Sequence, residues 1–399
     1  MESDDRTALT NRGNVGDVST HFLTALATIL LPMVLHAQIT FERTYGGEAS
    51  DEGSSAWQTG DGGYVITGAT YATGLSRPDV YVVRTDARGD TLWTRTLGDT
   101  CADRGEFVQQ TADGGYIVAG FTESFGAGRT DVYLMKFSAS GDTLWTRTFG
   151  GSNNDVAYSA EQTIDGGYII TGYTYSFGAG SSDVYLVKTD ASGDSMWTRT
   201  FGGGSYDWGN SVQQTADSGY IIVGGTISYG AGWEDVYLIK TDPRGTMQWC
   251  TTLGGSGNDV GNSVRQTTDS GYVLAGMTES FGAGDNDVFL VKTSANGDTV
   301  WTRTFGGPGP DWGRSVQQTL DGGYVVAGQM WTADTVQDMS TSSGPALAVR
   351  HCGQRPSAAL ATTAAITSSR PLTAAMSSPE PPAPSARRAV TFISSRPIG

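Results

Sequence analysis

Residues 145–197 read WTRTFGGSNNDVAYSAEQTIDGGYIITGYTYSFGAGSSDVYLVKTDASGDSMW and hold one complete copy of a pattern that fills most of the chain. The tetrad DGGY or DSGY returns every 52 residues, at Asp61, Asp113, Asp165, Asp217, Asp269 and Asp321. A tryptophan returns at the same interval, at Trp93, Trp145, Trp197, Trp249 and Trp301. A fixed period of this length indicates an array of identical supersecondary units.

The quoted segment predicts four short strands. WTRTFGG alternates between two faces, and the other three runs are rich in Val, Ile, Tyr and Thr. Asp-Gly-Gly between SAEQT and YIITGYT is a strong hairpin signal, and Gly193 in the turn ASGD is expected to need a positive φ. Four up-and-down strands per repeat predict an all-β fold, a β-propeller of four-stranded antiparallel blades. A solenoid is the alternative, although its repeat is usually shorter.

The repeated motifs also carry a family resemblance. W-T-R-T-F-G-G, D-G-G-Y-I, D-V-Y-L-V-K-T-D and the closing Trp together resemble the bacterial secreted β-propeller repeat family (SBBP type), and they are distantly similar to kelch repeats. The resemblance covers roughly residues 39–331, over which six copies agree in phase. It implies an exported or surface-held propeller. It implies no particular activity and carries over no catalytic residues.

The composition narrows the classes of partner. The 399 residues carry a formal net charge of −16, which argues against nucleic acid and anionic membrane surfaces because both require basic patches. Three cysteines, Cys101, Cys250 and Cys352, make an odd count and predict no disulfide framework.

The N-terminal part contains an apolar run from Phe22 to Ala37, FLTALATILLPMVLHA. This run is too short to span a bilayer comfortably, and it ends in a small residue. We therefore expect residues 1–37 to be a signal peptide with an atypical acidic extension, cut after Ala37. The alternative is a buried core segment. The propeller repeats then occupy residues 38–331, the mature chain has no transmembrane helix, and the predicted location is secreted or cell surface.

Residues 332–399 break the pattern, since they lack Trp and Tyr and hold eight of the 13 prolines. One interpretation is a low-complexity disordered stalk. The other is propeller sequence in the wrong reading frame, because four windows recover the repeat in phase when the frame is shifted. Leu372–Ala386, for example, permits DGGYVVAGATSSFGA. We interpret the tail as aberrant, with a frameshift between about Gln329 and Asp338.

The phase of the repeat bears on the number of blades. Ile39–Gly47, ITFERTYGG, matches WTRTFGG and is therefore expected to be the fourth strand of a blade rather than the first. In the restored frame the gene is expected to encode seven blades, and this strand would complete the last of them; the alternative is a longer restored protein with eight. The chain as written is expected to hold about five full blades plus a partial sixth.

An aspartate at the start of each hairpin is the first candidate for a site. It recurs at Asp51, Asp103, Asp155, Asp207, Asp259 and Asp311. Its expected role is to accept hydrogen bonds from backbone N–H groups in a turn; the alternative is a set of ligand or Ca²⁺ contacts. No other cofactor or metal is predicted, because His21, His36 and His351 all lie outside the repeats. No catalytic residue is singled out, although paired carboxylates for glycoside hydrolysis remain open.

The long loops, GGxxxD and SFGAGxx, should share one face of the blades, and long loops on a rigid scaffold usually carry function. Trp208, Trp233 and Trp312, with Tyr158 nearby, break the repeat there. Exposed Trp would suit stacking on sugar rings; the alternative is packing between blades. The predicted function is a non-enzymatic interaction or adhesion module for an extracellular protein or glycan. The alternative is a carbohydrate-binding protein or a polysaccharide-active enzyme.

Overall fold

The protein is described from a computed structural model, which covers residues 41–71, 77–331 and 346–347. The chain divides into two compact units, Met1–Ile39 and Thr40–Gly399, and the description concerns the second. The predicted signal peptide lies outside the described residues, and so does the predicted aberrant tail except for residues 346–347. The described residues form strands and their connections, with no helix among them.

The first three sheets have four strands each. Blade 1 contains β1 (Asp51–Gln58), β2 (Tyr64–Tyr71), β3 (Pro78–Thr85) and β4 (Thr91–Leu97). Blade 2 contains β5 (Asp103–Gln110), β6 (Tyr116–Thr122), β7 (Asp131–Phe137) and β8 (Thr143–Phe149). Blade 3 contains β9 (Asp155–Gln162), β10 (Tyr168–Thr174), β11 (Asp183–Thr189) and β12 (Ser195–Phe201).

The remaining sheets repeat this arrangement until the third strand of the sixth. Blade 4 contains β13 (Asp207–Gln214), β14 (Tyr220–Thr226), β15 (Asp235–Thr241) and β16 (Met247–Leu253). Blade 5 contains β17 (Asp259–Gln266), β18 (Tyr272–Thr278), β19 (Asp287–Thr293) and β20 (Thr299–Phe305). Blade 6 contains β21 (Trp312–Gln318), β22 (Tyr324–Gln329) and the two-residue β23 (Ala346–Leu347), which pairs with β22.

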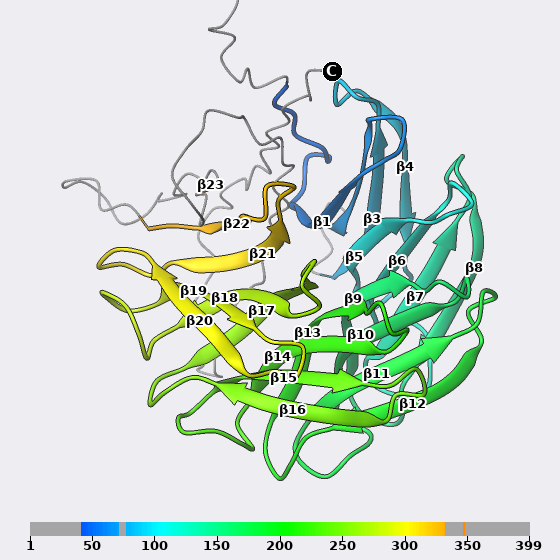
Figure 1. Ribbon diagram of the computed structural model, residues 1–399. Coiled ribbons are helices and arrows are strands. Elements are labelled where there is room, and N and C mark those ends of the chain that lie inside the picture. The colour runs from blue at the N-terminus through cyan, green and yellow to red at the C-terminus, as the bar shows by residue number, and fades with distance from the viewer. Residues whose placement is uncertain (1–40, 72–76, 332–345, 348–399) are drawn as a thin grey trace, which may run out of the picture. The chain divides into compact units, whose positions relative to one another are not determined.

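Within every sheet the strands follow chain order and neighbours are antiparallel, as in an up-and-down blade (Figure 1). The predicted fold is therefore confirmed: a β-propeller of four-stranded blades on a 52-residue repeat, with five complete blades and a partial sixth. The φ of 79° at Gly193 also agrees with the prediction from its turn.

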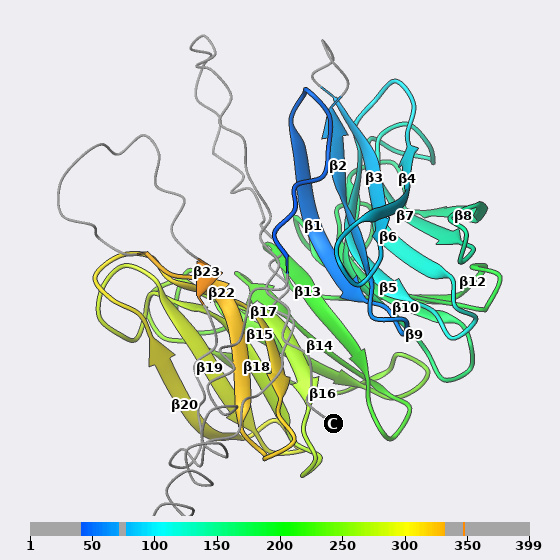
Figure 2. The same ribbon diagram turned by 90° about the horizontal axis from the view of Figure 1, so that it is seen from above.

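Consecutive blades pack face against face, and their first strands β1, β5, β9, β13, β17 and β21 lie next to one another (Figure 2). Between blades 2 and 3, Ile117 and Leu134 pack against Tyr168 and Tyr185. The third strands of blades 2–5 are buried along their whole length, whereas almost all residues of the fourth strands are exposed or only partly buried. Each buried apolar side chain contributes about 1.5–3 kcal/mol, so the blade junctions hold most of the stabilisation.

The two strongest sequence signals meet at these junctions. Trp145, in the fourth strand of blade 2, packs edge-on against Tyr168 of the tetrad in blade 3, with ring centroids 5.8 Å apart. The guanidinium of Arg147 lies over the Trp145 ring at 5.5 Å and forms an ion pair with Asp194 of blade 3 at 2.9 Å. The 52-residue period of the sequence thus corresponds to one aromatic and ionic contact between each blade and the next.

The segment before β1 occupies the place of a fourth strand. Phe41 lies 52 residues before Trp93 and packs edge-on against Tyr64, with ring centroids 5.6 Å apart. Arg43 forms an ion pair with Asp90 at 3.5 Å, the same relation that Arg147 has to the next blade. This placement agrees with the phase predicted for the segment.

The aspartate of the tetrad ties its hairpin to the third strand. Asp269 Oδ1 accepts hydrogen bonds from Thr267 Oγ1 at 2.5 Å, from the Gly271 amide at 3.0 Å and from Lys292 Nζ at 3.0 Å. The Lys292 side chain is buried, at 5% exposed, whereas that of Asp269 is 63% exposed. The same Lys–Asp ion pair recurs in blades 2, 3 and 4. The Lys of V-K-T-D therefore recurs because it pairs with the Asp of the tetrad.

Acid is expected to weaken these contacts. The Thr267 hydrogen bond, opposed by burial and reinforced by Lys292 and Gly271, lowers the pKa of Asp269 to about 2 from 3.8. Because the folded pKa is depressed, the stabilisation is present above about pH 4 and is lost as the pH falls toward 2. We expect the unfolding free-energy difference between the wild type and Asp269→Asn to shrink over that window in denaturant titrations. A difference that stays constant from pH 5 to pH 2 would contradict this.

Candidate functional site

The two ends of the blades differ in what they present. The connections from first to second and from third to fourth strand are tight turns, such as Thr163–Gly167 and Asp190–Asp194, each closed by backbone hydrogen bonds. The connections from second to third strand are the longest, with eight residues in blades 2–5, whereas those from one blade to the next span five or six residues. Up-and-down topology therefore places the tight turns on one face and the long loops on the other.

The long-loop face carries a repeated set of exposed aromatic side chains, here called the loop aromatics. Each lies in the S-F-G-A-G or S-Y-G-A-G loop and packs against an aromatic side chain of the third strand, with ring centroids 5.7–5.9 Å apart. Their exposed fractions are 42–48%, for Phe125, Phe177, Tyr229 and Phe281. The same aromatic position is therefore about half exposed in four consecutive blades.

A tyrosine cluster adds to the same face at the junction of blades 3 and 4. Ring centroids are 5.6 Å apart from Tyr158 to Tyr173, 5.6 Å from Tyr173 to Tyr175 and 6.3 Å from Tyr175 to Tyr206. Tyr175 is 41% exposed and Tyr206 is 45% exposed. Burial, with the neighbouring Tyr206 and Tyr158, raises the pKa of Tyr175. This cluster breaks the repeat and includes one predicted residue, Tyr158.

The three predicted tryptophans have different environments. Trp233, in the loop between β14 and β15, is 77% exposed. Trp208 is partly buried and lies against Gly225, which faces it in the β13–β14 register. Trp312 is also partly buried, with the Arg314 guanidinium 5.8 Å from its ring. The structure brings Tyr158 together with other tyrosines but does not group the three tryptophans.

The repeated aspartates bind the loop that precedes them. Asp155 Oδ2 accepts hydrogen bonds from the Gly151 amide at 2.8 Å and from Ser176 Oγ at 2.6 Å. A backbone amide four residues earlier donates to the same oxygen of all six: Asp51, Asp103, Asp155, Asp207, Asp259 and Asp311. In this way the carboxylate fixes the loop that leads into each blade.

A second aspartate lies beside each of these carboxylates from blade 2 onward. At Gly150, an added Cβ would overlap Asp131 and lie 2.7 Å from Asp155 Oδ2, so both carboxylates reach the same glycine. Burial, with a contribution from Asp155, raises the pKa of Asp131. Across the described ranges, no group of three or more His, Cys, Asp or Glu is placed to hold a metal ion.

The first strands carry charges that do not repeat. In blades 1 and 2, Arg104 forms ion pairs with Glu52 at 2.8 Å and with Glu106 at 2.9 Å. These two carboxylates share one buried guanidinium, so they form a structural ion cluster.

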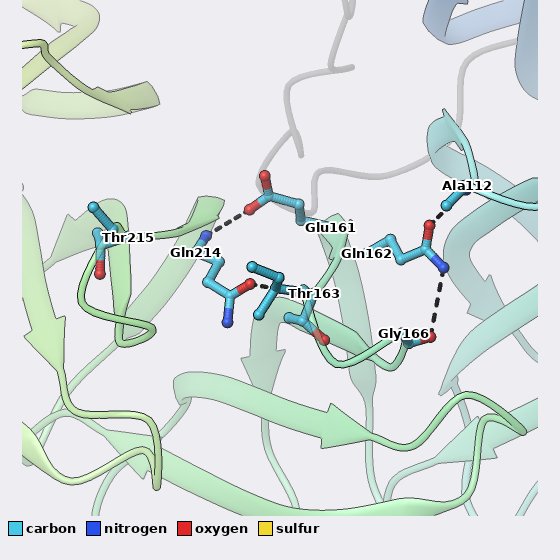
Figure 3. A pocket seen from close by; sticks show the side chains of 9 residues that line it. Ala112, Glu161, Gln162, Thr163, Gly166, Gln214 and Thr215 are labelled. Atoms are coloured by element: carbon cyan, nitrogen blue, oxygen red, sulfur yellow. Dashed lines mark hydrogen bonds between the residues drawn. The ribbon is translucent and has the colours of Figure 1, made fainter.

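A hollow of about 540 Å³ opens on the tight-turn face between blades 2, 3 and 4 (Figure 3). Its walls are the hairpin turns and the ends of the first strands, which contribute Ala112, Glu161, Gln162, Thr163, Ile164, Gly166, Gln214, Thr215 and Ala216. Glu161 is the single ionisable side chain in this lining. Sequence reasoning missed it, although Glu161 stands where the neighbouring blades have Gln109 and Gln213, a difference that the 52-residue phase reveals.

No family model matches the chain. The chain is 26% identical over 196 residues to the regulatory protein FlaEY of Caulobacter vibrioides, a match that covers 45% of this chain and 19% of that protein. The matched region thus spans about a fifth of the relative's length.

Two solved structures are similar at low identity. An α-L-arabinofuranosidase from Fusarium graminearum is 14% identical, with 74% of this chain and 95% of that chain covered and a TM-score of 0.49. The Pan2 WD40 domain of Neurospora crassa is 11% identical, with coverages of 70% and 72% and a TM-score of 0.45. Over the part of the chain that the structure describes, no helix has the length and apolarity needed to cross a membrane.

Proposed function

We propose that this protein is a non-enzymatic binding module that holds an extracellular partner on its long-loop face. The observation that carries the proposal is the set of loop aromatics, whose side chains stay 42–48% exposed in four consecutive blades. Aromatic side chains bury a large area at small entropic cost, which is why they dominate binding surfaces. The apolar run Phe22–Ala37 and the family resemblance support a secreted or surface-held location.

A carbohydrate partner is the second candidate, and the tyrosine cluster favours it. Tyr175 and Tyr206 offer two exposed phenol rings at nearly perpendicular orientation, with hydroxyl groups at their rims. Sugar rings pair an apolar C–H face with hydroxyl groups, so they match such a surface. Trp233, which also breaks the repeat and is exposed on this face, would extend it.

Removing the loop aromatics is expected to weaken binding about tenfold or more, since each aromatic contact contributes about 0.5–1.5 kcal/mol. The test compares wild type with Phe177→Ala/Tyr229→Ala for retention of labelled protein on whole bacterial cells. Leu320→Ala is the matched control, because Leu320 is an exposed apolar side chain on the tight-turn face. Equal retention of all three proteins would contradict the proposal.

A glycan array then separates the two partner classes. If the partner is a glycan, the wild type binds the array and Tyr175→Ala/Tyr206→Ala loses the signal. If the partner is a protein, the array stays blank, and protease treatment of the cells removes the retention.

A further inference from the structure

The tight turn between the third and fourth strands of blade 5 contains the one Asn-Gly pair of the sequence. In this turn, Ser294–Asp298 (SANGD), Asn296 is exposed, and Gly297 is buried with a φ of 86°. A Cβ built on Gly297 would lie 2.7 Å from the Trp249 ring of blade 4. The fold therefore requires glycine at this position, and it thereby fixes the residue that follows Asn296.

The fold does not require asparagine in this turn. Blade 2 has the turn Ser138–Asp142 (SASGD), which differs only at Ser140. In both turns the amide of the first residue donates to the carbonyl of the last at 2.8 Å, and the φ of the blade 2 glycine is 84°. Serine is thus compatible with the same backbone, so the amide side chain of Asn296 is not needed to form the turn.

The side chain of Asn296 also lacks the contacts that hold other asparagines. Asn210 and Asn262 donate from Nδ2 to the carbonyls of Gly261 and Gly313, at 2.9 Å each, and both are followed by serine. Asn296 takes part in its turn through its backbone amide, which donates to Ser294 Oγ at 3.2 Å. Within the described residues, its side chain forms no hydrogen bond. An exposed carboxamide is therefore left next to a residue without a side chain.

We propose that Asn296 is a site of spontaneous deamidation, at which the folded protein gains a negative charge without an enzyme. The backbone nitrogen of Gly297 gives up its proton and attacks Cγ of Asn296. The bond from Cγ to Nδ2 then breaks, ammonia leaves, and a cyclic imide remains. Water adds to either imide carbonyl and opens the ring to aspartate or isoaspartate. In sum, one water is consumed and the carboxamide becomes a carboxylate and an ammonium ion.

Glycine favours this attack because no Cβ shields its nitrogen. The Gly297 amide donates to the Ser294 carbonyl at 3.2 Å, and this hydrogen bond must open before the nitrogen can react. It is a single bond at the tip of an exposed hairpin, where local opening requires little free energy.

The products fall at a blade junction that has one contact fewer than its neighbours. Between blades 2 and 3, Arg147 forms an ion pair with Asp194 at 2.9 Å. Blade 4 has Thr251 at the position of Arg147, so this pair has no counterpart next to Asp298. A carboxylate at position 296 adds like charge beside Asp298, and isoaspartate inserts an extra backbone carbon atom before Gly297. The turn lies on the tight-turn face, so this proposal does not depend on the proposed binding surface.

The experiment incubates the purified full chain in mildly alkaline buffer, with and without urea, and follows digested samples by mass spectrometry. In the folded chain the Asn296 peptide is expected to gain the mass of the exchange of an amino group for a hydroxyl group. It should do so roughly tenfold or more faster than the peptides that contain Asn210 and Asn262. Separation into aspartate and isoaspartate products identifies the imide route.

Two matched variants exchange the turn sequences of blades 2 and 5. Asn296→Ser gives blade 5 the turn of blade 2 and should abolish the reaction there. Ser140→Asn gives blade 2 the turn SANGD and should create a second reactive site. The proposal is overturned if Asn296 stays intact in the folded chain, and reaction in urea alone would identify the fold as what protects it. It is also overturned if Asn210 or Asn262 reacts as fast, or if Ser140→Asn stays intact in blade 2.

Discussion

Replacing Gly172 by alanine is expected to lower the free energy of unfolding by about 3 kcal/mol, because the added methyl group has no space. Gly172 lies in β10 at the register shift with β9, where Tyr158 is the extra residue and the Val156 carbonyl comes close to the glycine. An added Cβ would overlap the Val156 carbonyl oxygen, and a backbone atom cannot move aside without breaking the β9–β10 pairing. Denaturant titration followed by near-ultraviolet circular dichroism measures the change.

Gly204→Ala serves as the control for this prediction. No atom lies within 4 Å of a Cβ built on Gly204, so the same substitution should change stability by less than about 0.5 kcal/mol. In a repeat protein each blade is stabilised by its neighbours, and the damage at Gly172 is expected to uncouple blade 3 from the array. If the two variants unfold at the same denaturant concentration, steric overlap at the bulge is not what keeps glycine there.

The fold could be predicted from the sequence because the patterns that specify the strands and turns are local and repeated. The alternation in WTRTFGG and the Asp-Gly-Gly turn each specify a strand or a hairpin from a few adjacent residues, and six copies remove the ambiguity of a single one. The glycine of YIITGYT has a different cause. It recurs because of a bulge in the neighbouring strand, and that bulge belongs to the pairing between strands.

The environments of the tryptophans were not predictable for the same reason. Trp208 is partly buried because Gly225 faces it across the sheet, where blades 3 and 5 have Tyr173 and Met277. Trp233 stays exposed because its loop offers no such partner surface. The environment of Trp208 follows from the register between two strands, which the spacing of residues along one strand does not contain.

The candidate sites show how far the period alone leads. The loop aromatics repeat with the 52-residue period and yet remain half exposed, so a repeated side chain need not belong to the core. The tyrosine cluster needs Tyr206 of one blade beside Tyr175 of another, a proximity that only the packing of blades creates. Glu161, in contrast, could have been found by aligning the six copies and asking where a glutamine of the neighbouring blades becomes charged.

Asp165→Ala is expected to lower the free energy of unfolding by about 2 kcal/mol, because it leaves the buried ammonium group of Lys188 without its carboxylate partner. The Lys188 side chain is 3% exposed and 2.9 Å from Asp165 Oδ2; without this partner its ammonium keeps the Thr189 carbonyl at 2.8 Å. The carboxylate itself is 52% exposed, so the pair is screened and the loss stays below that of a fully buried pair.

The second substitution Lys188→Met should recover part of that loss, since it removes the stranded charge and leaves an unbranched side chain in the same apolar space. What it cannot restore is the turn, where Asp165 also accepts from Thr163 Oγ1 at 2.5 Å and from the Gly167 amide at 3.1 Å. The double variant should therefore lie between Asp165→Ala and the wild type in urea titrations. A double variant no more stable than Asp165→Ala would mean that the aspartate acts through the turn alone, and that the Lys of V-K-T-D recurs for another reason.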